Sequence, residues 1–284
     1  MFGAIIGDMI GSVYEFKHIR TKDFDLFNKK ERMTDDSLLT IAVAKTLMNN
    51  YPIKYDSESL KKLQNELIGN FVKTWKKNRT AGYGMMFYDW CIRASKGDFT
   101  PYNSYGNGAA MRISPVGRVA KSEKEVKVLS RAVTEITHNH PEGIKGAEAV
   151  AMAIFIALNG ASKKEIKDRM ILYYPSIERF NFNALVKNYK DSDICENTVN
   201  VAIYCFLRSN SLEDAIRNAI AIGGDCDTIA AISGSIAEAY FSKDLPSKFE
   251  DEFMYLMIDP DVEKIVKDFH TMIGSKKFIR KLLW

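Results

Sequence analysis

Histidine and cysteine are both scarce in this sequence of 284 residues, which contains four of each. The cysteines show no Cys-x-x-Cys spacing, and in a chain of this length that pattern favours reduced, partly buried thiols over a disulfide framework. With so few nitrogen and sulfur ligands, an ordinary zinc site can hardly be built. Any metal in this protein must therefore be held mainly by oxygen.

A long apolar run and a strong excess of one charge are also missing. No segment approaches the roughly 18 consecutive apolar residues of a membrane span, and the apolar opening carries Asp8 and lacks the basic start and cleavage site of a signal peptide. Lys and Arg total 40 against 36 Asp and Glu, which is too close to balance to indicate a nucleic-acid partner. We therefore expect a cytoplasmic monomer with no membrane partner.

Helix signals dominate what is present. The composition, 46% hydrophobic and 27% charged, is typical of a soluble globular protein, and no Pro/Gly/Ser-rich linker divides the chain. Three segments are apolar nearly all round and predict buried central helices: residues 38–48, 147–158 and 229–240. Capping boxes are predicted at Ser122–Glu125 and Ser162–Glu165, with a shorter-armed version at Ser211–Asp214. We expect one compact all-α domain of orthogonally packed helices over residues 1–284.

The first segment combines small residues with acids. Gly3, Gly7 and Gly11 recur every four residues, which gives a helix one smooth face for close packing. Asp8 and Glu15 are seven residues apart and would share a face if the helix continues that far. A polar edge facing water is the alternative interpretation of these acids.

Two further acid-rich motifs stand immediately before predicted buried helices. Thr34–Ser37 reads Thr-Asp-Asp-Ser, and Gly223–Thr228 reads Gly-Gly-Asp-Cys-Asp-Thr. Capping of the helix N-termini would explain either motif alone. Buried acids are costly unless they are paired or bound to metal, however, and neither motif contains Lys or Arg. Together they offer an all-oxygen ligand set suited to Mg²⁺, Mn²⁺ or Ca²⁺, with room for two ions about 3.5–4 Å apart.

Three loops have compositions that suit ligand contact. Asn103–Arg112 contains Ser-Tyr-Gly-Asn-Gly before an apolar segment, and its small residues would let backbone N–H groups cradle an anion. Thr137–Pro141 places two histidines before an apolar helix, for which we favour hydrogen bonding to a ligand over metal ligation, with capping as the alternative. Asn78–Gly84 contains Gly-Tyr-Gly, which can present a ring to a flat ligand. Ordinary turns would produce the same loop compositions.

Taken in order, these motifs resemble the ADP-ribosylglycohydrolase family, which includes ADP-ribosylarginine hydrolases. The resemblance rests on GAIIGDMIGSVYE, TDDS, GYG, SYGNGAAMR, THNHPEG and GGDCDT, which extend from residue 3 to the Ala230–Tyr240 segment. It implies an all-α domain with a cleft that holds two divalent cations, Mg²⁺ or Mn²⁺. The implied metal ligands are Thr34, Asp35, Asp36, Asp225, Asp227 and Thr228. Glu15 matches a glutamate at the cleft mouth that contacts metal or water and can gate the site.

The same resemblance implies an ADP-ribose site. Its residues would be Ser104, Tyr105, Gly106 and Asn107 at the diphosphate and ribose, His138 near the same ligand, and Tyr83 beside the adenosine. Asn103 stands where some relatives have glycine.

The reaction implied is hydrolysis of the N-glycosidic bond between ADP-ribose and a modified residue, for which we expect arginine on a protein or small molecule. ADP-ribose would be the product. Asp35 would accept the proton of the attacking water, with Asp36 as second choice and Glu15 as the alternative base. An acid such as Asp89 or Asp98 would hold the departing guanidinium.

Three other functions stay open at this point. One is hydrolysis of another ADP-ribose linkage: serine, O-acetyl-ADP-ribose, poly-ADP-ribose or a nucleic-acid base. Another is a non-catalytic ADP-ribose-binding or crystallin-like protein, which would be expected to have broken metal motifs, whereas TDDS and GGDCDT are intact. The third is an immunity role against an ADP-ribosylating toxin.

Overall fold

The structure, a computed structural model, describes residues 1–241 and 259–274. These residues form helices and no β-strand, apart from one isolated bridge between Gly106 and Ile194. The all-α prediction is therefore confirmed. The helices are α1 (Phe2–Gly11), α2 (Asp35–Asn49), α3 (Ser57–Lys77), α4 (Met85–Ala94), α5 (Gly108–Met111), α6 (Ser114–Val119), α7 (Glu123–Thr134), α8 (Pro141–Leu158), α9 (Lys163–Ile171), the 3-10 helix η1 (Pro175–Arg179), α10 (Phe182–Asn188), α11 (Cys195–Arg208), α12 (Leu212–Ile222), α13 (Cys226–Tyr240) and α15 (Pro260–Met272).

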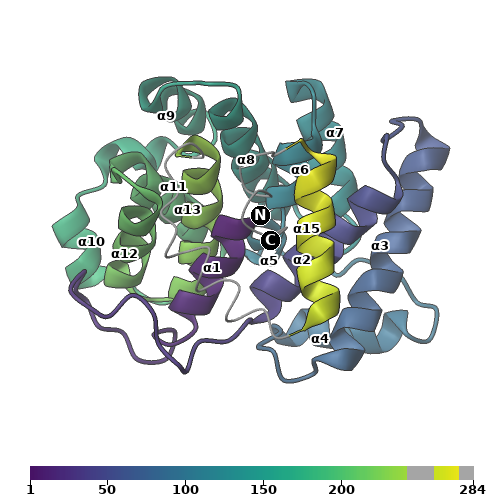
Figure 1. Ribbon diagram of the computed structural model, residues 1–284, viewed down its shortest axis with the longest axis horizontal. Coiled ribbons are helices and arrows are strands. Elements are labelled where there is room, and N and C mark those ends of the chain that lie inside the picture. The colour runs from purple at the N-terminus through teal and green to yellow at the C-terminus, as the bar shows by residue number, and fades with distance from the viewer. Residues whose placement is uncertain (242–258, 275–284) are drawn as a thin grey trace.

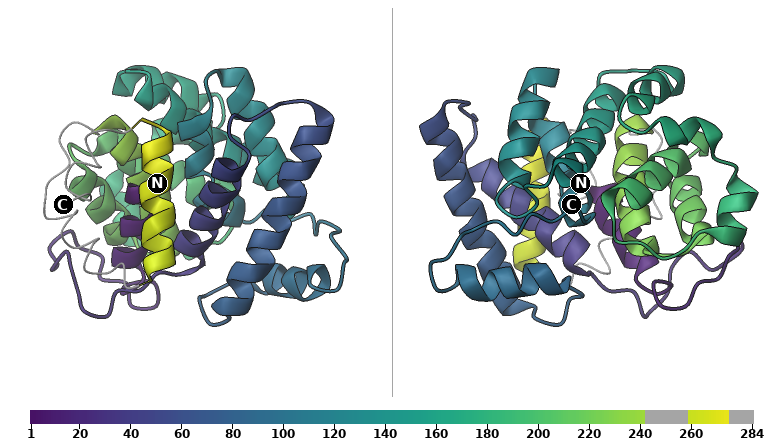
Figure 2. Two further views of the ribbon diagram at one scale, coloured as in Figure 1. Left: turned by 45° about the vertical axis from the view of Figure 1, so that its right-hand side comes forward. Right: turned by 180° about the vertical axis from the view of Figure 1, so that it is seen from behind.

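The helices are arranged around α1 and α13, which pack side by side near the centre of the molecule (Figure 1). Helices α10, α11 and α12 lie on one side of this pair, and α2, α3 and α4 lie on the other. Helix α15 runs across α2, as the turned view in Figure 2 also shows. The first helix and a helix from late in the sequence therefore meet at the centre, where α8 also packs against α13.

The predicted buried segments lie within α2, α8 and α13. Every residue of α13 from Cys226 to Ala239 is buried, as is every residue of α1. A helix with no exposed face must be surrounded by other helices, which accounts for its nearly uniform apolar sequence. Within the described residues, no helix is long enough and apolar enough to cross a membrane.

The glycine repeat of α1 faces α13. A methyl group added at Gly7 would lie 2.3 Å from the Ala230 carbonyl oxygen, and one added at Gly11 would lie 2.4 Å from Cα of Asp227. Gly3, one turn earlier in α1, meets Gly234, one turn later in α13. Only glycine allows the two backbones to approach this closely, so the repeat positions the N-terminal helix directly against the start of α13.

The predicted helix starts are present, but only one of them is a complete capping box. Ser162 accepts from the Glu165 N–H while the Glu165 carboxylate accepts from the Ser162 N–H. Ser122 and Ser211 cap α7 and α12 by accepting a backbone N–H. The carboxylates of Glu125 and Asp214 do not bond back to these serines. Glu125 accepts a hydrogen bond from Tyr55, and Asp214 accepts from Lys22 and from the Asn210 N–H. Tertiary partners have replaced the local return bond.

Candidate metal and ligand cleft

A cleft of about 600 Å³ opens where α2, α4, α5 and α13 converge. Its walls come from seven separate parts of the chain, so no single motif forms it. The predicted site residues that line it are Glu15, Asp35, Asp36, Ser104, Gly106, Asn107, His138, Asp225, Asp227 and Thr228. Thr34, Tyr83 and Tyr105 are not part of its lining.

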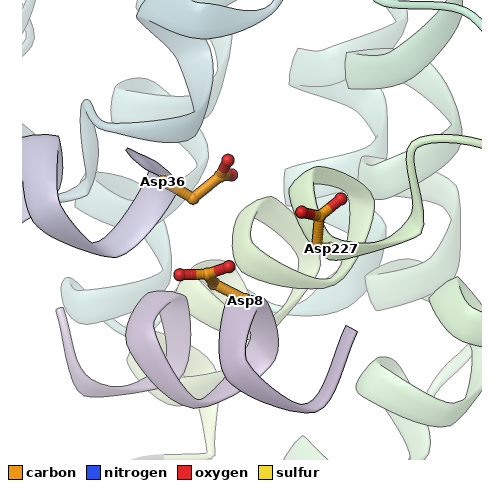
Figure 3. Close-up of side chains that lie close together, drawn as sticks. All are labelled: Asp8, Asp36 and Asp227. Carbon is orange, nitrogen blue, oxygen red and sulfur yellow. The ribbon is translucent and has the colours of Figure 1, made fainter. Parts of the chain in front are cut away.

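Three buried carboxylates converge at the base of this cleft (Figure 3). They come from α1, the first turn of α2 and the first turn of α13, and their side chains point toward one common space. One oxygen of each of Asp8, Asp36 and Asp227 lies within 4.8 Å of the other two, a spacing that could hold a metal ion. The two acid-rich motifs thus meet, although about 190 residues separate them in sequence.

Asp8 was not among the ligands predicted from the sequence. Its carboxylate accepts hydrogen bonds from the Thr34 N–H (3.0 Å) and hydroxyl (2.7 Å), and from the Ser37 N–H (3.1 Å) and hydroxyl. It therefore ties α1 to the first turn of α2 and orients the Thr-Asp-Asp-Ser motif. The available signal was a lone acid inside a glycine-patterned helix, a pattern that predicts a buried carboxylate in need of partners.

Asp36 retains unused bonding capacity. Its Oδ2 accepts from the Thr228 hydroxyl at 3.1 Å, which links the two motifs directly. Its Oδ1 is buried and has no hydrogen-bond partner among the described residues. A buried, unpartnered carboxylate oxygen is costly, and it is the atom expected where a cation completes the site.

The acids of the cleft raise one another's pKa values. Burial, followed by the charges of Asp8 and Asp225, raises the pKa of Asp35 to about 8. Burial also raises the pKa of Asp8 to about 6, against the opposing hydrogen bonds from Ser37 and Thr34. Asp36 and Asp227 have pKa values well above the usual range for the same reasons. The protein thus gathers more negative charge than it neutralises here, and a bound cation would relieve that repulsion.

Glu15 reaches the cleft from a turn and not from a helix. Helix α1 ends at Gly11, so the expectation that Asp8 and Glu15 share one helical face is wrong. Burial and the charge of Asp225 raise the pKa of Glu15 to about 7, while Arg32 opposes the shift. Its turn is held by His18, whose Nε2 lies 2.9 Å from the Glu15 carbonyl oxygen.

The 104–107 loop is linked to the second acid-rich motif. The Asn107 side-chain amide donates to Asp225 Oδ2 (2.6 Å) and to the Thr198 hydroxyl (3.2 Å), so both of its N–H groups are used. Asn107, predicted to contact substrate, thus orients Asp225. Ser104 is buried, and its hydroxyl accepts from the Gly106 N–H at 3.1 Å. The loop is therefore pre-shaped by its own hydrogen bonds.

The predicted histidine and tyrosine ligand contacts differ in burial and in their position relative to the cleft. His138 is 4% exposed and lines the cleft, whereas Nδ1 of His140 caps α8 by accepting the Glu142 N–H, so the capping alternative holds for this histidine. Tyr105 is 53% exposed and packs edge-on to the His140 ring. Tyr83 stacks on Phe87, while the glycines on either side of it line the cleft.

Neither acid suggested for the leaving group lines the cleft. Asp89 is exposed on α4, and Asp98 forms an ion pair with Arg93 at 2.7 Å. Sequence proximity to the 104–107 loop misled here because Asp89 lies on an exposed face of α4, and Asp98, beyond the end of that helix, is held by Arg93. The acids that line the cleft apart from the two motifs and Glu15 are Asp191 and Asp193, which precede α11.

The stability of the metal-free protein should fall as the pH rises, and bound metal should oppose this fall. In the metal-free protein the raised carboxyl pKa values mean that the folded state binds protons more tightly than the unfolded state. The contribution of these carboxyl groups to the free energy of unfolding is therefore fully present below about pH 4. It is lost as the pH rises toward the Asp35 pKa of about 8. We predict that the melting temperature in EDTA falls by on the order of 5 °C between pH 5 and pH 8.

Mn²⁺ should raise the melting temperature more at pH 8 than at pH 5, because protons compete for the same oxygens. Scanning calorimetry with KCl at matched ionic strength is the control. A flat profile in EDTA, or equal Mn²⁺ effects at both pH values, would contradict the clustered arrangement of carboxylates.

Comparison with known proteins shows similarity in family, sequence and fold. The family model described as ADP-ribosylglycohydrolase matches residues 1–277. Human ADP-ribosylhydrolase ARH3 is 24% identical over 310 aligned positions that span 85% of this chain and 84% of its own. ADP-ribosylarginine hydrolase Tri1 of Pseudomonas putida (strain GB-1) is 23% identical over 270 positions, spanning 85% of this chain and 69% of its own. A solved ADP-ribosylglycohydrolase-related protein complex shares the fold, with a TM-score of 0.64, 18% identity and coverage of 96% and 97% of the two chains.

Proposed function

Because the chain belongs to the ADP-ribosylglycohydrolase family, we propose that it hydrolyses the N-glycosidic bond between ADP-ribose and an arginine guanidinium. Removal of ADP-ribose by hydrolysis is the activity that the family and its relatives carry by name. The observation that carries the proposal is the convergence of Asp8, Asp36 and Asp227 at the base of the cleft. The arginine linkage is favoured by the acids that line the same cleft and by the similarity to an ADP-ribosylarginine hydrolase.

We propose that the site holds two divalent cations, Mg²⁺ or Mn²⁺, with the cluster of Asp8, Asp36 and Asp227 at its base. The clustered donors are carboxylates with neighbouring threonine hydroxyls, which are hard oxygen ligands, and Oδ1 of Asp36 is buried without a partner. The proposed ligands are those of the two acid-rich motifs: Thr34, Asp35, Asp36, Asp225, Asp227 and Thr228. The Thr34 hydroxyl donates its proton to Asp8, so Asp8 would orient the Thr34 oxygen toward a metal ion. Cations bound there would lower the pKa of a water molecule and would help to orient the ribose hydroxyls.

Asp35 is the proposed proton acceptor for the attacking water. It lines the cleft at the first residue of α2, and a methyl group at Gly82 would lie 3.2 Å from its Oδ1, so this carboxylate faces the Gly-Tyr-Gly loop. Asp36 is second choice, because one of its oxygens already accepts from Thr228. Glu15 is the alternative base, since it lines the same cleft.

The leaving guanidine must depart as a cation, so carboxylates on its side of the cleft would hold it. Asp191 and Asp193 replace Asp89 and Asp98 in this role, because they line the cleft and the other two do not. As the bond to the anomeric carbon breaks, positive charge also develops on the ribose ring. The negative surroundings described above stabilise both charges.

Release of free ADP-ribose from ADP-ribosylated arginine in the presence of Mg²⁺ or Mn²⁺ tests the proposal. A panel of serine-linked, O-acetyl, poly-ADP-ribose and nucleobase-linked substrates identifies the preferred linkage, and EDTA is the control. We expect the arginine linkage to turn over at least tenfold faster than the others. Asp191→Asn and Asp193→Asn should raise KM for that substrate, whereas Asp98→Asn should not. No turnover on any linkage with metals present would contradict the proposal, and preference for another linkage would replace arginine.

A further inference from the structure

Arg112 is a buried cation at the wall of the cleft. It is 1% exposed, and its guanidinium lies 4.6 Å from the ring centroid of Phe71 and 5.5 Å from that of Phe87. Burial lowers its pKa to about 10, against the raising effects of Tyr102 and Asp35, so it stays charged at neutral pH. In the described chain it forms no ion pair with a carboxylate within 4.0 Å. A buried charge without a paired acid is costly, which suggests that the charge has a use in the cleft.

The polar contact of Arg112 leads to a hydroxyl. Its Nη2 donates to Thr137 Oγ1 at 2.6 Å. Because a guanidinium can only donate, this bond occupies a lone pair of the hydroxyl oxygen and leaves the hydroxyl proton free to point elsewhere. Three acceptors are within reach of that proton: His138 Nδ1 at 2.9 Å, the Thr134 carbonyl oxygen at 3.3 Å and the Tyr102 hydroxyl oxygen. The shorter contact favours donation to His138.

Because Nδ1 of His138 accepts this hydrogen bond, the Nε2–H of the ring is left as a donor toward the cleft. The imidazole is 4% exposed, and burial followed by the charge of Arg112 lowers its pKa well below the usual range, so the ring is neutral. A neutral ring whose Nδ1 accepts must carry its proton on Nε2. Nε2 has no hydrogen-bond partner among the described residues, and a methyl group at Gly108 would lie 3.1 Å from it. The 104–108 loop and the cleft are therefore next to the N–H.

We propose that Arg112 and Thr137 are positioning residues that hold His138 as a neutral Nε2–H donor for an anionic oxygen of the substrate. This inference rests on the proposed function, in which that oxygen belongs to the diphosphate of ADP-ribose. The chain of bonds from guanidinium to hydroxyl to imidazole polarises each donor in turn. A neutral donor binds an anion without leaving a second unpaired cation in the protein when the cleft is empty.

The tautomer of His138 tests the relay without reference to activity. With only four histidines in the chain, ¹⁵N-histidine labelling of the full protein gives a resolvable spectrum, and His138→Gln identifies the signal. We expect a protonated Nε2 and an unprotonated Nδ1, with no titration between pH 5.5 and 8.5. A proton on Nδ1, or titration within that range, would overturn the proposal.

Binding measurements test what the relay does. Thr137→Val removes the hydroxyl and keeps the shape, and we expect it to weaken ADP-ribose binding about tenfold by calorimetry, with adenosine binding unchanged. Thr137→Ser should restore affinity to within about twofold. Thr134→Val is the matched control, since Thr134 is equally buried and its hydroxyl has no partner in the described chain; its affinity should equal that of the wild type.

The two proposals fail in different ways. If Thr137→Val binds ADP-ribose as tightly as the wild type, the relay is wrong and the proposed function stands. If the wild type binds no ADP-ribose, the proposed function is wrong and the tautomer alone decides the relay.

Discussion

Asp227→Asn should abolish metal-dependent turnover and, at the same time, make the metal-free protein more stable. Asp227 lies with Asp8 and Asp36 in one buried group, and its pKa is raised well above the usual range by burial and by the charges of Asp36 and Asp225. Asparagine keeps the shape and can still accept the Thr228 N–H that Asp227 Oδ1 accepts at 3.0 Å. It removes one charge from a set of repelling carboxylates, so the apo protein gains stability while a cation loses a ligand.

Turnover should fall at least about a thousandfold, because both nucleophile activation and ribose orientation are proposed to need the metals. Mn²⁺ titration calorimetry should show a lost or strongly weakened site. In EDTA at pH 8 the melting temperature should rise by about 2–4 °C. Asp168→Asn is the control, since Asp168 is exposed and its ion pair in the described part of the chain is with Lys164 on the same helix; it should change none of the three. Unaltered Mn²⁺ affinity in Asp227→Asn would remove this residue from the proposed ligand set.

Gly7→Ala should destabilise the fold more than any exposed substitution of equal size. The added methyl group would lie 2.3 Å from the Ala230 carbonyl oxygen and 2.6 Å from its carbon, so α1 and α13 must move apart. Both atoms are backbone of a buried helix and cannot rotate out of the way. Overpacking of this kind costs about 1–3 kcal/mol, sometimes more, which exceeds the gain of about 1 kcal/mol from replacing glycine in a helix.

Gly69→Ala makes the same chemical change without the clash. Gly69 is an exposed interior residue of α3, and a methyl group there meets nothing within 4 Å. We expect it to stabilise the protein by about 0.5–1 kcal/mol. Urea unfolding followed by circular dichroism measures both variants. If Gly7→Ala is as stable as Gly69→Ala, the close approach of α1 and α13 is not what the glycine repeat provides.

The sequence by itself determined the features that depend on neighbours along the chain. Glycine at every fourth position predicts a smooth helix face, serine before a charged run predicts a helix start, and scarce histidine and cysteine predict oxygen ligands. The order of the motifs identified the family and, with it, the fold and the class of reaction. These inferences hold because helix periodicity, capping and ligand chemistry are local properties of residue type.

Only the tertiary structure decided which side chains meet. Asp8 joins Asp36 and Asp227 because the glycine face of α1 packs on α13, and nothing in the local sequence of Asp8 names that partner. In the same way, Asn107 bonds Asp225 across 118 residues. Such contacts depend on the rotation and closeness of whole helices, which hydrophobic burial and backbone shape set together. Residue types therefore predicted oxygen ligands, and helix packing determined which of those side chains lie close together.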